Sequence, residues 1–331
     1  GGDPIQAEIL LTAWAFDCAD NDLLNETIFT RHKIINRAIE SLDSTSIGLW
    51  VDGDLGCYTD DYFGCDTSLN TVYFYNADNV DGQTDDGRCG GNIITYEENP
   101  PVQAITFLNQ PMTTLTYYNN GVIGNPPAGT TNPRQASEFY NYLTGSWRDG
   151  SPLTLGDDGH YDGYPTAHAF PSNPNDTTGW SMYQLRRNPD LDIAVLPSVN
   201  NDIRLAPGAS IVLDIAYSFH REEGSNHLQN VNFALGRIPE LQAIYDQKFA
   251  VECMQRVQCE EDCIYPGDLN QDGIADEADV LALGIGIGRD SVGVLRDHST
   301  HKWIAQDALD WENQLINGTN YKHIDANGDG I

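Results

Sequence analysis

The segment from Asp268 to Asp279 has the residue types and the spacing of a calcium-binding loop. Calcium is a hard cation that takes about six to eight oxygen ligands, and a 12-residue loop supplies them from positions 1, 3, 5, 7, 9 and 12. Gly273 stands at position 6, where such a loop turns sharply, and an apolar run typical of the exit helix follows Asp279. The loop therefore predicts a calcium site formed by Asp268, Asn270, Asp272, the backbone carbonyl of Ile274, Asp276 and Asp279.

A second copy of the same spacing begins at Asp325. Its positions 1, 3 and 5 carry side-chain oxygens, Gly330 stands at position 6, and position 7 offers its backbone carbonyl. Positions 9 and 12 lie past the last residue of the sequence. We therefore expect the first half of a second calcium loop, formed by Asp325, Asn327, Asp329 and Ile331.

A third group of acidic residues lies near the start of the chain, among glycines and between two strand-like runs. So many carboxylates lie close together only when they are solvated, protonated or neutralised by a cation. We interpret the group as a further calcium site, and a solvated acidic loop with Asx turns is the alternative. The candidate ligands are Asp52, Asp54, Asp60, Asp61, Asp66, Asn76, Asp78 and Asp81.

The charge balance excludes two classes of partner. The chain has 331 residues, and 17 basic against 49 acidic side chains give a formal net charge of −32. Such a surface repels nucleic acid and anionic membranes. No apolar run reaches the length of about 18 residues that a membrane-spanning helix needs, so we expect no membrane insertion. An exported protein that collects divalent cations fits this balance, and adaptation to high salt is the alternative.

The seven cysteines form two clusters, at residues 57–89 and 253–263, with Cys18 apart from both. Such clusters indicate disulfides in an oxidising compartment, and therefore secretion. A zinc site at Cys253, Cys259 and Cys263 is the competing interpretation, but no fourth ligand with zinc-site spacing follows. Because the count is odd, one thiol is free or pairs outside this chain.

The first two-thirds of the chain predict a mainly β fold. Short runs rich in β-branched and aromatic residues alternate with turn-forming segments, which favours a jelly-roll-like β-sandwich. Two helices are expected, at residues 134–147 and 238–252, with their aromatic side chains in the core. The composition changes after the second helix, so we expect a sandwich domain at 1–255 and a calcium-binding segment at 256–331. The predicted strands are IQAEILLTAWAF, ETIFTRHKII, SIGLWV, NTVYFY, VQAITFL, TTLTYY and SIVLDIAYSF.

Two resemblances follow from these motifs. The paired half-loops at 268–279 and 325–331 resemble the dockerin type I repeat, in which two EF-hand-like calcium loops build a small helical domain. The run CIYPGDLNQDGIADEADVLALGIGIG, with SIGLWVDGDLGCYTDDYFGCDTSLNTVYFYNADNVDG upstream, resembles secreted surface proteins of Bacteroidetes-type bacteria. That resemblance implies export by type IX secretion and a location at the cell surface or outside the cell. It implies no catalytic activity.

Catalytic motifs do not appear in the sequence. It contains no HExxH helix, GxSxG elbow, Walker loop or dinucleotide fingerprint. We therefore expect no enzyme, but a calcium-binding structural or adhesive module of a larger extracellular protein. Its expected partners are calcium ions with other copies or surface proteins. The alternative is a carbohydrate-binding accessory module of a secreted polysaccharide-degrading enzyme.

Overall fold

The computed structural model describes residues 5–18, 21–82, 94–120, 126–185, 193–249, 263–265, 267–271, 279, 308–315 and 318–325. The chain divides into two compact units, one of Gly1–Asp17 with Asn21–Val251 and one of Cys18–Asp20 with Glu252–Ile331. The first unit contains the strands and is mainly β, as predicted.

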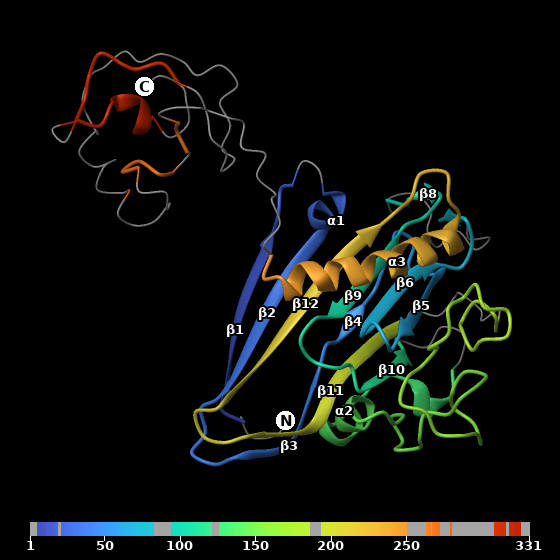
Figure 1. Cartoon of the computed structure of the whole chain (residues 1–331). Helices are drawn as coiled ribbons and strands as arrows, with labels where there is room; N and C mark the ends of the chain where they lie inside the picture. Colours follow the sequence, from blue (N-terminus) through green and yellow to red (C-terminus); the bar gives the residue numbers. More distant parts are fainter. Residues whose placement is uncertain are drawn as a thin grey trace. The chain divides into compact units, whose positions relative to one another are not determined.

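A six-stranded antiparallel sheet forms the larger layer of the first unit (Figure 1). Tyrosine, phenylalanine, valine and isoleucine dominate its central strands, where both faces are buried. The hairpin between the last two strands places Asp61 opposite Asn76. In order across the sheet, the strands are β1 (Ala7–Ala15), β2 (Thr27–Asn36), β12 (Ser210–His220), β9 (Val102–Phe107), β6 (Thr71–Asn76) and β5 (Asp61–Asp66).

A second antiparallel sheet packs on one face of the first. The rings of Phe63 in β5 and Tyr117 in the second sheet lie with their centroids 5.3 Å apart. Phe74 of β6 lies so close to Gly53 that a Cβ atom at position 53 would clash with its ring. Two packed sheets are the arrangement of a sandwich. The second sheet runs β10 (Thr114–Asn119), β11 (Ile193–Leu205) and β3 (Leu42–Gly48), with β4 (Val51–Asp52) also on β11; β7 (Val80–Asp81) pairs separately with β8 (Glu97–Glu98).

The helix α3 (His227–Asp246) contacts β9, β12 and β6 of the six-stranded sheet (Figure 1). It begins eleven residues before the expected start at Ile238 (238 − 227). Asn226 caps its N-terminus, and Val231 and Ala234 in its first turns are buried. Pro239 lies inside this helix. Burial of the apolar face outweighs the backbone hydrogen bond that a proline removes.

The helix α2 (Ala136–Leu143) is shorter than predicted and buries a different side chain. Tyr142 is fully buried, whereas Phe139 and Tyr140 are each 49% exposed, so the expected aromatic core face was wrong at those two positions. Tyr142 packs at 5.4 Å from Tyr118 of β10, which selects that face of the helix. Other helical segments of the described residues include α1 (Asp22–Asn25) and the 3₁₀ turns η1 (Ala128–Thr130) and η2 (Tyr321–His323).

The second unit has a small core of its own, in which Trp311, Leu315 and Tyr321 are buried and Ile324 packs against them.

Among the described residues of the whole chain, no helix is long and apolar enough to cross a membrane.

Candidate calcium sites

Three aspartates of the first acidic group converge where the loops around β5, β6 and β7 meet. Asp60 directly precedes β5, Asp61 begins it, and Asp81 ends the short strand β7. Asp60 is 3% exposed and Asp81 is 2% exposed. Asn76, which lies opposite Asp61 at the end of β6, is fully buried. Asp60 and Asp81, which are 21 positions apart in the chain (81 − 60), thus lie at the same end of the sandwich.

Backbone N–H groups from the same loops bind several of these carboxylate oxygens. Asp81 accepts from Cys57 N at 2.8 Å and from Tyr96 N at 2.5 Å. Asp61 Oδ2 accepts from Leu55 N at 2.7 Å, and Asp60 Oδ2 accepts from Gly82 N at 3.2 Å. The carboxylates therefore fix three loops against the strands.

Two buried oxygens remain without a hydrogen-bond partner, Oδ1 of Asp60 and Oδ1 of Asp61. The Asn76 amide lies near enough to Asp60 to lower its pKa, but its buried Nδ2 makes no hydrogen bond of normal geometry. None of the three carboxylates forms an ion pair with a described basic side chain. An unsatisfied buried polar group costs about 1–3 kcal/mol and a charged one costs more, so these atoms point to a missing partner.

Burial and mutual repulsion make the charged forms of Asp60 and Asp61 unfavourable. Burial raises the pKa of Asp60 to about 6; the Gly82 hydrogen bond opposes the shift, and the charge of Asp81 adds to it. Burial also raises the pKa of Asp61 well above its ordinary value, and the charges of Asp60, Asp81 and Asp54 add to that rise. A divalent cation would reverse both shifts, because it favours the ionised carboxylates.

A small cavity of about 10 Å³ lies beside this group, lined by Asp54 and Asp61 together with Gly53 and Tyr58. Such a volume is about that of one water-sized sphere. Among the described residues, no three His, Cys, Asp or Glu side chains surround one metal position. A cation here would therefore use one or two carboxylates and complete its shell with backbone carbonyls and water, which calcium accepts.

The other predicted ligands of this group lie farther out. Asp52 ends β4, Asp54 follows two residues later, and both are exposed. Asp78 is exposed as well and accepts from Val80 N at 2.8 Å in an Asx turn. Asp66 lies at the opposite end of β5 from Asp61, where it accepts from Ser68 N and Leu69 N and caps the turn. The structure therefore does not bring Asp66 to Asp60, Asp61 and Asp81.

In the C-terminal loop, the first and last predicted ligands are both buried, Asp268 at 5% exposed and Asp279 at 4%. Asp279 Oδ1 accepts from Leu269 N at 2.7 Å and from Asn270 N at 3.0 Å, so position 12 folds back onto positions 2 and 3. That closure is what a 12-residue calcium loop requires. Asp325, the first ligand of the second loop, is 3% exposed. The other predicted ligands, Asp272, Ile274, Asp276, Asn327, Asp329 and Ile331, lie outside the described residues.

The cysteines resolve part of the disulfide question. Cys18, Cys57 and Cys263 are each disulfide-bonded, and Cys65 is a buried free thiol. A disulfide at Cys263 argues against the zinc alternative, because a zinc ligand is a thiolate. The bond at Cys57 lies within the loop whose N–H binds Asp81. The remaining cysteines lie outside the described residues.

The sequence signals that located the acidic group did not rank its members. Asp60 and Asp81 are buried, whereas Asp52 beside Val51 and Asp66 beside Cys65 are not, so apolar neighbours in the chain did not mark the buried members. A comparison with protein-family models finds no match to this chain, and a comparison with curated proteins finds none either.

Proposed function

We propose that this chain is a non-catalytic, calcium-binding structural or adhesive module of a secreted, cell-surface or fibre-forming protein. In this proposal, the first unit is a jelly-roll-like sandwich and the second is a dockerin-like calcium segment. The observation that carries the proposal is the pair of buried oxygens, Asp60 Oδ1 and Asp61 Oδ1, that have no partner. A divalent cation would stabilise a fold that buries carboxylates without a basic partner.

Calcium would act here as a cross-link between loops. The loop that precedes β5 and the loop that follows β6 already share hydrogen bonds through Asp60 and Asp81. A +2 ion at this place would remove the repulsion among the aspartates and hold both loops against the sandwich. Disulfides at Cys18, Cys57 and Cys263 support an oxidising, extracellular location, and they stiffen the chain in the same regions.

The C-terminal loop supports the same role independently. Asp279 at position 12 accepts hydrogen bonds from the backbone of positions 2 and 3, and Asp268 at position 1 is buried. A module with calcium sites in both units would become rigid only in a calcium-rich medium. Extracellular fluids meet that condition.

Isothermal titration calorimetry of the full chain after chelation tests the proposal. We expect calcium binding that Asp61→Asn reduces in the first unit and that Asp268→Asn reduces in the second, each without abolishing the other. The control is Asp66→Asn, which lies at the opposite end of β5 from Asp61 and should bind as the unmodified chain does. Absence of any calcium binding by the folded chain would overturn the proposed function.

A further inference from the structure

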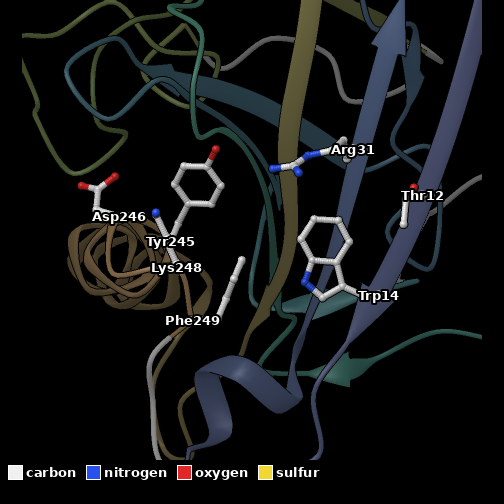
Figure 2. A pocket seen from close by; sticks show the side chains of 7 residues that line it. All are labelled: Thr12, Trp14, Arg31, Tyr245, Asp246, Lys248 and Phe249. Carbon is white, nitrogen blue, oxygen red and sulfur yellow. The ribbon is translucent and has the colours of Figure 1, made fainter. Parts of the chain in front are cut away.

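A second site lies in the first unit, on the opposite face of the six-stranded sheet from the second sheet. There, the end of α3 stands beside β1 and β2 and leaves an open cavity of about 760 Å³ (Figure 2). Strands β1 and β2 supply Thr12, Trp14 and Arg31, and the residues from Tyr245 to Phe249 supply the opposite wall. A cavity of this size lies within the range of about 300–1,000 Å³ that is usual for sites that bind small molecules.

Arg31 is held in the cavity by a partner buried beneath it. Its Nε and Nη2 each donate to Asp214 of β12 at 2.7 Å, and the Tyr245 hydroxyl donates to the same carboxylate at 2.5 Å. The Asp214 side chain is 2% exposed, whereas that of Arg31 is 52% exposed. The guanidinium is therefore fixed in place, with N–H groups left over on its exposed side.

Aromatic rings form the apolar part of the same wall. Trp14 stacks on Phe29 at 5.7 Å and 16°, and the edge of Phe249 meets it at 5.8 Å. Both Trp14 and Phe249 remain partly exposed, as does Tyr245. In Figure 2, the three rings border one opening together with Arg31.

Lys248 occupies a backbone position that normally favours glycine. The end of α3 is a Schellman turn, in which Lys248 N donates to Tyr245 O at 2.8 Å and Phe249 N donates to Ile244 O at 3.0 Å. Lys248 and Phe249 have φ of 55° and 56°, in the left-handed region where a side chain is strained. The turn brings both side chains to the cavity wall. Glycine would suit the backbone at position 248 better than lysine does.

The charges around the cavity balance. Arg31 and Lys248 are cationic, while Asp246 lines the opening and Asp214 neutralises Arg31 from below. Asp246 Oδ1 accepts from Gln242 Nε2 at 2.9 Å, and Asp246 lies at the rim of the cavity. The wall thus offers one fixed donor at Arg31, a second cation at Lys248 and a carboxylate at Asp246 beside flat aromatic surface, without an excess of either charge.

We propose that this cavity binds a neutral saccharide. A sugar ring has hydroxyl groups that both donate and accept hydrogen bonds, and a face of C–H groups that packs on an aromatic ring. Arg31 and Lys248 donate to hydroxyls, Asp246 accepts from them, and Trp14 or Phe249 carries the apolar face. An anionic ligand would meet Asp246 and the net charge of −32 of the chain, so the neutral sugar fits better. This inference is independent of the proposed calcium sites.

Native affinity electrophoresis of the full chain in calcium-containing buffer tests the inference. The probes are laminarin, dextran, galactomannan and xylan as neutral polysaccharides, with polygalacturonate as the anionic comparison. We expect at least one neutral polysaccharide to retard the protein. Lys248→Gly and Trp14→Leu should each weaken that retardation about tenfold, since each removes one contact. Lys248→Gly should keep or raise the melting temperature, because glycine suits the left-handed position.

The matched control is Trp50→Leu. Trp50 is also exposed, at 55%, but it lies on the β3–β4 connection, away from the strands and helix that line the cavity. This variant should be retarded as the unmodified chain is. The inference is overturned if no neutral polysaccharide retards the protein, if only polygalacturonate does, or if Lys248→Gly and Trp14→Leu are retarded normally. Asp61→Asn should be retarded normally, so a failure of the calcium proposal would leave this result unchanged.

Discussion

Gly56 lies directly against Asp81, so that a Cβ at position 56 would come within 1.9 Å of Asp81 Oδ2. Gly56 also has φ of 78°, which side chains rarely adopt. Gly56→Ala should therefore displace the carboxylate from Cys57 N and Tyr96 N and destabilise the protein by about 2–4 kcal/mol. Urea unfolding monitored by circular dichroism measures the change.

Gly208→Ala is the control for this variant. Gly208 has φ of 77°, but a Cβ there would meet nothing within 4 Å. This substitution should cost only the backbone strain of about 1–2 kcal/mol. Equal losses for the two variants would mean that the contact with Asp81 contributes nothing to stability.

Asp61→Asn should change the stability of the protein differently with and without calcium. In a chelator it removes a carboxyl group whose charged form is disfavoured by burial and by the charges of Asp60 and Asp81, so the melting temperature should stay equal or rise. In excess calcium it removes a ligand, so the calcium-dependent gain in stability should shrink. Asp66→Asn caps its turn with an amide oxygen instead and should change neither value much. A loss for Asp61→Asn in both conditions would indicate a purely structural carboxylate.

Removal of calcium should lower the stability of the unmodified chain. For a site with a dissociation constant one-hundredth of the calcium concentration, binding contributes about 2.7 kcal/mol to the free energy of unfolding. Differential scanning calorimetry in excess EDTA and in calcium measures the difference, with magnesium as the control for a non-specific effect of divalent cations. Identical melting temperatures in EDTA and calcium would contradict the calcium sites in both units.

The stability of the calcium-free chain should fall as the pH rises past the pKa of Asp60. That pKa is raised from 3.8 to about 6, so the folded state binds the proton more tightly than the unfolded state does. The resulting stabilisation is complete below pH 3.8 and is lost as the pH rises through about 6. Calcium affinity should change the other way and weaken below about pH 6, since the ion and the proton compete.

Asp60→Asn isolates this effect from the other titrating groups. The difference in unfolding free energy between the variant and the unmodified chain, followed in chelator from pH 4 to pH 8, should favour the variant increasingly toward high pH. A difference that does not vary with pH would show that Asp60 does not titrate with a raised pKa.

Thiol labelling should find one reactive cysteine, and only after unfolding. Cys65 is 1% exposed, and burial raises the pKa of its thiol, so the reactive thiolate is scarce in the folded chain. Cys65 is the free thiol among the described cysteines; if it is also the only one in the chain, the other six form three disulfides (7 − 1 = 6). A local bridge within 57–89 would join Cys57 to Cys89, since Cys65 is free. Peptide mapping without reduction checks the pairing, and labelling of the native protein at Cys65 would contradict its burial.

The sequence by itself determined the mainly β fold of the first unit and the regions of acidic loops. Strands such as β2, β6, β9, β10 and β12 were predictable, because alternating β-branched and aromatic residues are a local signal. β11 was missed because Pro197 and Asn200 interrupt that signal. The early start of α3 was missed because Pro239 suits the first turn of a helix, where the expected helix placed it. The spacing of Asp268 and Asp279 similarly predicted a closed loop.

Only the tertiary structure decided which candidates share a site. It brought the carboxylates of Asp60, Asp61 and Asp81 together and left Asp66 at the other end of β5, although Asp66 is only five residues from Asp61 (66 − 61). It also joined Arg31 to Asp214, which lie 183 residues apart and carry no local pattern that links them. Burial and long-range pairing depend on how the strands are ordered in the sheet, and that order is set by the packing of the whole chain rather than by neighbouring residues.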